Sequence, residues 1–274
     1  MRPSSPEERQ RRAASFNEDP EKYDRARPTY PAALFDRLWV LAGLRESPEI
    51  VEVGCGTGQA SIALAERGAH LTCVEAGDKM AALARKNLAR FPDVDVVVSK
   101  FEEWDPAGRT YDLVFAAASW HWVPSDIRYT HAASVLRPGG HVATAHSQHV
   151  YPEGFDPLFI PIQEAYREVT GSAHEVKAHE LPAAGEFDHR DLEHVAELER
   201  VGGFEAPVVE RFLWTFDRTA DQFIDLYGTF SDHWVLEPEK RAELFSRIHR
   251  IIADSPEGKI RKHYLTSLRV ARRV

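Results

Sequence analysis

The chain has 274 residues, a formal net charge of −9 and a hydrophobic share of 43%. This length can bury a substantial core, in one large domain or in a domain with a cap. The acidic balance, with a pI near 5.8, argues against a nucleic-acid partner, because phosphate backbones are bound by basic surfaces. No apolar run is long enough to cross a bilayer and the first residues lack an apolar signal segment, so we expect a cytoplasmic protein with no membrane partner.

The first half of the chain alternates short apolar runs with amphipathic stretches. A polar lead, residues 1–15, is expected to be mobile or a frayed helix, and apolar spacing predicts a helix over residues 30–44. Strands separated by helices predict a parallel sheet. The expected strands lie at residues 50–53, 70–75, 94–98, 111–118 and 141–147, and the expected helices between them at 61–67, 78–91 and 126–136.

The second half departs from this alternation. Helical stretches around residues 156–169 and 189–201, with Pro and Gly breaks, predict an inserted helical cap. A strand at 206–217, helices at 219–230 and 237–254 and a last strand at 259–274 then follow. We therefore expect a lead and lid at 1–45, a core at 46–147, the cap at 148–205 and completing elements at 206–274.

The segment "VEVGCGTGQA", residues 51–60, joins the first strand to a helix through three closely spaced glycines. Glycines gather where the chain needs positive φ or where a ligand approaches the backbone. The dinucleotide pattern G-x-G-x-x-G is broken, because position 59 is Gln59. Glu52, two residues before the first glycine, would oppose a pyrophosphate and favour a cofactor that carries positive charge.

An acidic residue ends the second predicted strand. Glu75 lies about twenty residues beyond the first glycine, where a carboxylate can accept hydrogen bonds from both ribose hydroxyls. Together with the glycine segment, it predicts a site for an adenosyl group without phosphates.

These residues resemble those of the class I S-adenosylmethionine-dependent methyltransferases. The resemblance rests on Glu52-x-Gly54-x-Gly56-x-Gly58, on Glu75, and on "DLVFAAASWHWV" (112–123) and "VLRPGGHVA" (135–143). "YDRARPTYP" (23–31) and "SWHWV" (119–123) are similar to the small-molecule branch that includes trans-aconitate methyltransferase-like proteins. The clear resemblance covers about residues 16–146. It implies an α/β fold with a Rossmann-like sheet, mostly parallel with an antiparallel carboxyl-terminal edge, and S-adenosyl-L-methionine as the cofactor.

The resemblance also implies which residues contact the cofactor. Lys100 stands where many members carry an acid, so the polar contact to the adenine amine is expected from Glu102. The cofactor-binding candidates are Tyr23, Arg27, Glu52, Gly54, Gly56, Gly58, Glu75, Ala76, Met80, Phe101, Glu102, Ala116, Ala117 and Trp120.

The catalytic candidates are His121, Tyr30 and His146. A carboxylate acceptor is already ionised at neutral pH, whereas a hydroxyl or amine acceptor would need a base such as His121 or His146. No metal is expected, because the sequence contains neither H-E-x-x-H nor C-x-x-C.

The sequence therefore predicts a methyltransferase acting on a small molecule, with carboxylate O-methylation favoured by the branch resemblance. One alternative is a catalytically silent protein that binds S-adenosylmethionine and acts through partners. The other is an NAD-dependent oxidoreductase on a similar fold, which Gln59 and Glu52 disfavour.

Overall fold

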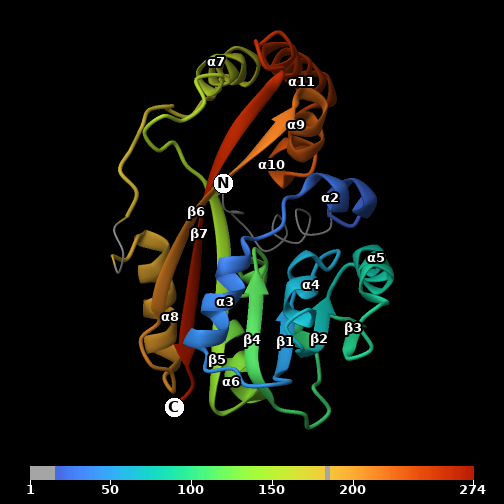
Figure 1. Cartoon of the computed structure of the whole chain (residues 1–274), viewed down its shortest axis with the longest axis vertical. Coiled ribbons are helices and arrows are strands. Elements are labelled where there is room, and N and C mark those ends of the chain that lie inside the picture. The colour runs from blue at the N-terminus through green and yellow to red at the C-terminus, as the bar shows by residue number, and fades with distance from the viewer. Residues whose placement is uncertain (1–15, 183–185) are drawn as a thin grey trace. The chain divides into compact units, whose positions relative to one another are not determined.

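The computed structural model describes residues 16–182 and 186–274, so the predicted lead at 1–15 lies outside the described residues (Figure 1). It contains a seven-stranded sheet in the order β3-β2-β1-β4-β5-β7-β6. The strands are β1 (Glu49–Val53), β2 (His70–Glu75), β3 (Val94–Val98), β4 (Tyr111–Ala117), β5 (Leu136–His149), β6 (Val208–Thr219) and β7 (Lys259–Arg272).

Helices connect the strands. The amino-terminal half carries α2 (Pro20–Ala26), α3 (Ala32–Leu41), α4 (Gln59–Ala65), α5 (Asp78–Leu88) and α6 (Arg128–Val135), with 3₁₀ turns η1 (Phe101–Glu103) and η2 (Trp120–Trp122). The later half carries α7 (Phe159–Thr170), α8 (His189–Val201), α9 (Ala220–Tyr227), α10 (Ser231–Trp234) and α11 (Pro238–Ala253).

The strand pairing confirms the predicted fold class. β1 pairs in parallel with β2 and β4, β2 with β3, and β4 with β5. The carboxyl-terminal edge is antiparallel: near one end of β7 the amide of Val150 donates to the carbonyl of His263, and near the other that of Gly139 donates to Arg273. The sheet is therefore mostly parallel with an antiparallel edge, as the resemblance implied.

The described chain forms two compact units. Unit 1 comprises residues 16–28, 148–181 and 213–265, and unit 2 comprises residues 29–147, 182–212 and 266–274, apart from the undescribed residues 183–185. Three of the boundaries between them fall within β5, β6 and β7, and the other two, at residues 28/29 and 181/182, fall outside helices and strands. The four segments expected in chain order stay a prediction.

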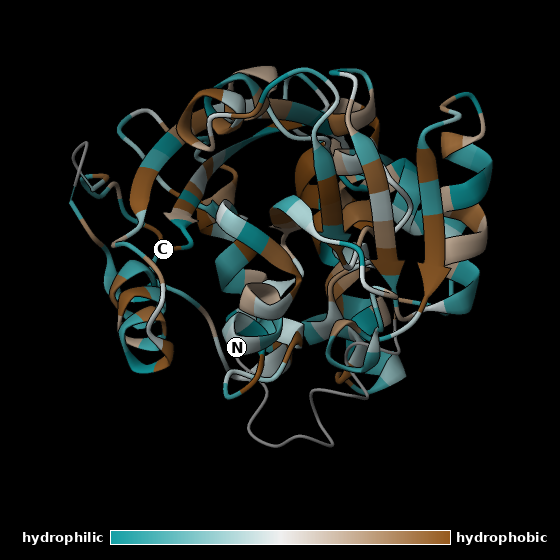
Figure 2. Ribbon diagram, turned by 90° about the horizontal axis from the view of Figure 1, so that it is seen from below, coloured by the Kyte–Doolittle hydropathy of each residue, from teal (hydrophilic) through white to brown (hydrophobic). Residues whose placement is uncertain are grey.

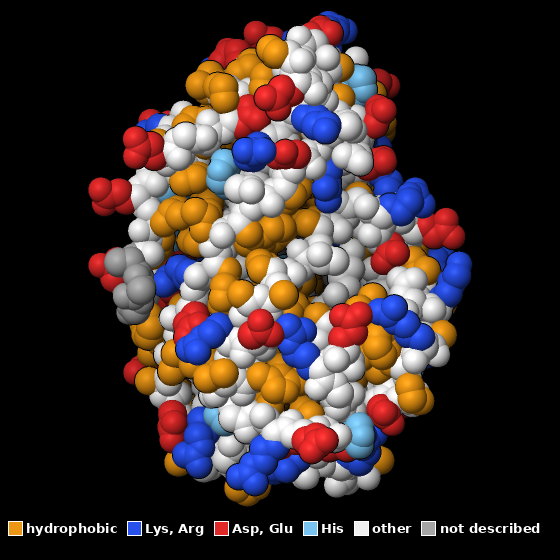
Figure 3. All heavy atoms as spheres, in the orientation of Figure 1, with side chains coloured by type: hydrophobic (Ala, Val, Ile, Leu, Met, Phe, Trp, Pro, Cys, Tyr) orange, Lys and Arg blue, Asp and Glu red, His pale blue; other side chains and the backbone are white. Residues whose placement is uncertain are grey.

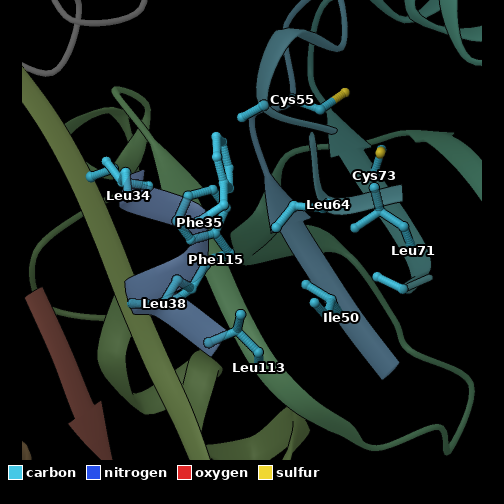
Figure 4. Packing of buried hydrophobic residues seen from close by; sticks show 14 of the residues in the cluster. Leu34, Phe35, Leu38, Ile50, Cys55, Leu64, Leu71, Cys73, Leu113 and Phe115 are labelled. Atoms are coloured by element: carbon cyan, nitrogen blue, oxygen red, sulfur yellow. The ribbon is translucent and has the colours of Figure 1, made fainter. Parts of the chain in front are cut away.

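Unit 2 has an apolar core on the central strands. Figure 4 shows side chains of β1, β2 and β4 meeting those of α3 and α4 in one cluster, and Cys55 and Cys73 lie in it as free, buried thiols. Ile50, Leu113 and Phe115 of this cluster are fully buried. Brown apolar segments run along the central strands in Figure 2, as expected for parallel strands covered on both faces.

Unit 1 has a core of its own. Phe159 of α7, Phe223 of α9 and Ile248 of α11 are fully buried in one cluster with Ile260 of β7. The three helices thus pack their apolar stripes on one another and on the strand.

Two features differ from the sequence-based expectations. Helix α2 forms within the predicted lid, where the side chain of Asp19 caps the amide of Lys22. The fifth strand begins at Leu136 rather than 141, because the R-P-G-G segment continues the strand through an irregularity in its pairing with β4. At Gly140 an added Cβ would lie 3.0 Å from the Asp112 carbonyl oxygen, so only glycine lets the two strands stay this close.

The surface carries charges of both signs. Acidic and basic side chains are interspersed on the face shown in Figure 3. No helix in residues 16–182 and 186–274 combines the length and apolar character that crossing a membrane requires.

Candidate functional site

The candidate site lies in unit 2, at the carboxyl ends of parallel strands. β1 ends at Val53, β2 at Glu75 and β4 at Ala117, and a predicted site residue lies at or just beyond each of these ends. Because parallel strands end on the same edge of a sheet, the glycine loop, Glu75 and the small residues of β4 are brought to one edge.

The glycine loop, residues 54–58, has the backbone conformation that its composition predicts. Gly54, Gly56 and Gly58 have φ values of +65°, +61° and +96°, in the left-handed region that favours glycine. The amide of Gly54 donates to the Val74 carbonyl at 2.7 Å, and an added Cβ at Gly54 would lie 2.6 Å from Cβ of Ser119. The loop is therefore held close to the ends of β2 and β4. A side chain at position 54 would overlap with Ser119.

Glu75 joins the glycine loop to the turn after β2. Its Oε2 accepts a hydrogen bond from the Gly56 amide at 2.8 Å, and its Oε1 accepts one from the Gly77 amide at 2.8 Å. Burial raises the pKa of Glu75, while the amides of Gly77 and Gly56 oppose the rise. Because each carboxylate oxygen can accept more than one hydrogen bond, the group can still receive two ribose hydroxyls.

Glu52 is buried, with 1% of its surface exposed. Ser61 Oγ donates to its Oε2 at 2.6 Å. Burial raises the pKa of Glu52 to about 8, despite the hydrogen bond from Ser61, and the nearby Glu75 adds to the rise. A cationic group beside Glu52 would favour the ionised form, so the acid fits a positively charged cofactor better than a pyrophosphate.

Ser61 and Ser119 contact the candidate site, and the sequence reasoning missed both of them. Ser119 Oγ donates to the Val53 carbonyl oxygen. This hydrogen bond links the segment after β4 to the end of β1. Ser61 could have been found as a polar residue on the buried face of α4, between Ala60 and Leu64. Nothing in the local pattern singles out Ser119.

β4 ends in small residues with a strained connection. Ala116 is fully buried, and Ala117 is partly buried. Ala118 has φ of +55° although it is not a glycine, and its amide donates to the Ala145 carbonyl at 2.8 Å. Such strain is kept where the surrounding structure holds it, often at functional sites.

Trp120 and Phe101 pack in the core of unit 2. They are 4% and 3% exposed, and their ring centroids lie 6.1 Å apart. The Trp120 Nε1 atom is buried and has no hydrogen-bond partner in the described part of the chain. Their contact with the cofactor stays a prediction, since this packing alone accounts for much of their burial.

The remaining adenosine-site candidates are dispersed along the same edge. Ala76 is exposed directly after Glu75, and Met80 is buried in α5. Glu102 is partly exposed in η1, while Lys100 Nζ pairs with Glu103 Oε1 at 2.8 Å. The pairing of Lys100 with Glu103 is compatible with the predicted adenine contact of Glu102, which stays untested.

The three catalytic candidates have different environments. His121 is exposed, and its ring lies 6.1 Å from that of His146. His146 Nε2 accepts a hydrogen bond from Nη1 of Arg190 in α8, and burial, Arg190 and His121 lower the pKa of His146 well below its usual range. Tyr30 packs edge-on against Phe35 at 6.4 Å. His146 is thus a weak base, and its Nε2 atom is already occupied by the hydrogen bond from Arg190.

Tyr23 and Arg27, the predicted lid contacts, belong to unit 1. Arg27 Nε donates to Thr229 Oγ1 at 2.8 Å and Nη2 donates to the Thr229 carbonyl at 2.9 Å. Its guanidinium lies 5.0 Å from the Tyr23 ring centroid and 4.4 Å from that of Phe230. The role of the two residues in cofactor binding stays a prediction.

Comparison with known proteins supports the motif analysis. Residues 50–140 match a family model described as a methyltransferase domain. An uncharacterized methyltransferase of Mycobacterium tuberculosis is 32% identical over 126 residues, which are 46% of this chain and 49% of the relative. A trans-aconitate 2-methyltransferase of Escherichia coli is 35% identical over 97 residues, 34% of this chain and 37% of the relative.

A solved structure is similar over most of the chain. A protein from Anaeromyxobacter dehalogenans, described as a type II methyltransferase, has a TM-score of 0.57 and 23% identity, with 90% of this chain and 97% of that chain covered. This likeness concerns the fold. The aligned segments span about half the length, or less, of the curated relatives named above. Together the matches confirm the resemblance to class I methyltransferases.

Proposed function

We propose that this protein transfers a methyl group from S-adenosyl-L-methionine to a small molecule, because residues 50–140 match a family model described as a methyltransferase domain. The observation that carries the proposal is the bridge that Glu75 makes from the Gly56 amide to the Gly77 amide, at 2.8 Å on each side. It combines a rigid carboxylate with a bare glycine loop, as an adenosyl group requires.

The residues of the chain would bind and orient the two reactants. S-adenosyl-L-methionine supplies an activated methyl carbon on a positively charged sulfur. Glu75 would hold the ribose, the glycine loop would allow close approach of the cofactor to the backbone, and the buried acid Glu52 would favour its cationic part. Alignment and exclusion of water are the main contributions of the protein in such a transfer.

We propose a carboxylate as the acceptor. An acceptor carboxylate oxygen would form the new bond to the methyl carbon while the carbon–sulfur bond breaks and its electron pair stays on sulfur. An ester and a neutral thioether result, and no proton is released. This chemistry suits a site in which His146 is kept neutral and receives a hydrogen bond from Arg190. The similarity to a trans-aconitate 2-methyltransferase over about a third of the chain also supports it.

The proposal is tested with methyl-labelled S-adenosylmethionine and a fractionated metabolite extract, followed by mass spectrometry. We expect a labelled product that mild base hydrolyses, since esters are base-labile. A base-stable product would instead indicate nitrogen or ether oxygen as the acceptor atom. Donor binding without any labelled product would favour a catalytically silent binder, and absence of donor binding would contradict the proposed cofactor.

The variant Glu75→Gln provides the matched preparation for this assay. It keeps the shape of the side chain, but the amide nitrogen of Gln cannot accept a hydrogen bond, so one of the two bonds from the Gly56 and Gly77 amides is lost and the other becomes neutral. We therefore expect at least roughly tenfold weaker binding of S-adenosylhomocysteine by calorimetry. Glu46→Gln changes an exposed acid and should leave the affinity unchanged. Equal affinities of the two variants would contradict the role of Glu75.

A further inference from the structure

The turn η2, which follows β4 in unit 2, carries one of the catalytic candidates. Its first residue, Trp120, is buried, whereas His121 is exposed and Trp122 is partly exposed. The ring centroids of His121 and Trp122 lie 4.6 Å apart. The orientation of this single turn therefore decides where both side chains point at the edge of the sheet.

The backbone of η2 does little to fix that orientation. The Trp122 amide donates to the Ser119 carbonyl at 2.9 Å, and the Val123 amide donates to the Trp120 carbonyl at 3.3 Å, a long distance for such a bond. Ala118, just before the turn, has φ of +55°. Because a short 3₁₀ turn has poorer hydrogen-bond geometry than an α-helix, contacts with the rest of the fold must hold it.

Arg128, the first residue of α6, supplies such a contact from the interior. Its Nη1 atom donates to the Trp120 carbonyl oxygen at 3.0 Å. Its guanidinium carbon lies 5.9 Å from the ring centroid of Trp120 and 5.8 Å from that of Tyr129, and 9% of the residue is exposed. A buried cation thus holds a main-chain atom of η2.

The guanidinium is itself held by α8, which packs against α6 (Figure 1). Nε and Nη2 of Arg128 donate to Oε2 and Oε1 of Glu197 at 2.7 Å and 2.6 Å. This two-bond geometry fixes the plane of the guanidinium. Because Nε and Nη2 bind the carboxylate, Nη1 is directed to the Trp120 carbonyl.

A gain in stability explains this pair poorly. The side chains of Arg128 and Glu197 are 10% and 18% exposed, and the desolvation of two charges buried to this degree offsets much of their attraction. An apolar pair of similar volume would fill the space at less cost, but it could not donate to the Trp120 carbonyl. The contact with η2 is therefore the property that requires an arginine here.

The same helix also holds the second histidine of the candidate site. Arg190 and Glu197 lie on one face of α8, about two turns apart, and Nη1 of Arg190 donates to Nε2 of His146 in β5. The rings of His146 and His121 lie 6.1 Å apart. α8 therefore holds both the strand end that carries His146 and, through Arg128, the turn that carries His121.

We propose that Arg128 is a positioning residue for methyl transfer: by binding the Trp120 carbonyl while Glu197 holds its guanidinium, it keeps His121 and Trp122 in one orientation toward the acceptor. This inference rests on the proposed function, because it assigns η2 to the acceptor side of that site. Small displacements slow a transfer that depends on alignment. Loss of Arg128 should therefore lower the rate of transfer without lowering the affinity for the cofactor.

Fluorine NMR of protein labelled with 5-fluorotryptophan tests this role without requiring turnover. The chain has six tryptophans, and Trp122→Phe and Trp39→Phe assign two of their signals. Arg128→Met removes the ion pair and the bond to η2, whereas Glu197→Gln removes the charge of the pair but leaves Arg128 in place. We expect the Trp122 signal to shift or broaden in Arg128→Met and to change less in Glu197→Gln, while the Trp39 signal from α3 stays the same in both.

The kinetic measurement uses the same proteins. In Arg128→Met we expect kcat for formation of the labelled ester to fall at least tenfold, while calorimetry gives an affinity for S-adenosylhomocysteine within twofold of the wild type. Arg90→Met breaks an exposed pair with Glu66 and should change neither the Trp122 signal nor kcat. If Arg128→Met fails to fold, Arg128→Lys replaces it, because a single ammonium cannot reproduce the three contacts of the guanidinium.

The possible failures of the two proposals are distinct. The role of Arg128 is overturned if its variant leaves the Trp122 signal as in the wild type, or if Glu197→Gln changes that signal as strongly. A loss of S-adenosylhomocysteine affinity as large as the loss of kcat would also overturn it, since that result indicates a general structural role. Absence of a labelled ester from the wild-type protein would instead contradict the proposed function, and the fluorine signals would still decide whether Arg128 holds η2.

Discussion

At the scale of single residues, burial decides how the acids of the candidate site behave. In the sequence, Glu52 and Glu75 are two ordinary acidic residues. In the fold, Glu52 is buried with Ser61, and Glu75 accepts hydrogen bonds from two backbone amides. The enclosed acid has a pKa of about 8, so it is largely protonated near neutrality. Its ionisation is therefore linked to folding and to any cation placed beside it.

Glu52→Gln gives a prediction for the pH dependence of stability. The folded-state pKa of about 8 lies above the ordinary value of 4.5, so the folded protein binds the extra proton between these limits. The wild type should lose stability as pH rises from about 5 to about 8, relative to Glu52→Gln, by at most about 1.4 kcal/mol per pH unit. Urea unfolding at a series of pH values measures this, and a constant difference between the two proteins would exclude the linkage.

At the scale of elements, the glycine loop is constrained by two separate requirements, a left-handed backbone and a close approach to a neighbour. Gly54 has both, with φ of +65° and Ser119 within 2.6 Å of an added Cβ. Gly68, after α4, has φ of +82° and nothing within 4 Å. Substitution of Gly68 therefore measures the stability lost through the left-handed backbone alone, whereas substitution of Gly54 adds the stability lost through steric overlap.

Replacing each glycine by alanine measures these costs. Gly68→Ala should lose about 1–2 kcal/mol of stability, the cost of the left-handed backbone alone. Gly54→Ala should lose a further 1–3 kcal/mol or so, because the neighbouring backbone must move to admit the methyl group. Denaturant unfolding compares the two variants. Equal losses would show that the contact with Ser119 relaxes without cost.

Helix α8 is fastened to the sheet of unit 2 by a buried ion network. Asp191 is fully buried, and its Oδ1 accepts from Arg269 Nε at 2.5 Å while its Oδ2 accepts from Arg211 Nη2. The same helix supplies Arg190, which binds His146. The network thus places a cationic group of α8 beside a predicted catalytic residue.

Removal of the buried acid should be costly. Asp191→Asn removes the carboxylate that both arginines share and leaves Asp188, 3.9 Å from Arg269 Nη2, as their remaining acid partner. We expect a loss of about 3–5 kcal/mol in the free energy of unfolding. Asp36→Asn breaks an exposed pair with Arg67 and should cost less than about 1 kcal/mol. Thermal and urea unfolding of both variants provide the comparison, and a similar small loss in each would mean that water reaches the network.

At the scale of the whole molecule, cofactor binding should increase the free energy of unfolding of unit 2. A ligand at one hundred times its dissociation constant stabilises the folded state by about 2.7 kcal/mol. With S-adenosylhomocysteine at that concentration, hydrogen exchange of amides in β1 and β2 should slow accordingly. In Glu75→Gln a tenfold weaker affinity should reduce the stabilisation to about 1.4 kcal/mol. Equal protection in both proteins would contradict a ligand site at Glu75.

The sequence by itself determined the features that depend on near neighbours along the chain. Short apolar runs predicted the strands around Val51, Cys73 and Val96, because the hydrophobic pattern is a local property of the sequence. The glycine spacing predicted the left-handed loop for the same reason, and Glu75 followed from its position at a strand end. Fold class and cofactor could thus be predicted from segments of ten to twenty residues.

Only the tertiary structure decided which distant groups meet and how they ionise. The hydrogen bond of Arg190 to His146 joins residues 44 positions apart, and Lys262 Nζ of β7 lies 4.8 Å from the ring centroid of Tyr227 in α9, 35 positions away. No local pattern specifies such contacts, since they arise when elements pack against one another. Packing also decides burial and charge partners, which shift pKa values. For this reason the raised pKa of Glu52 and the lowered pKa of Lys262 become visible only in the fold.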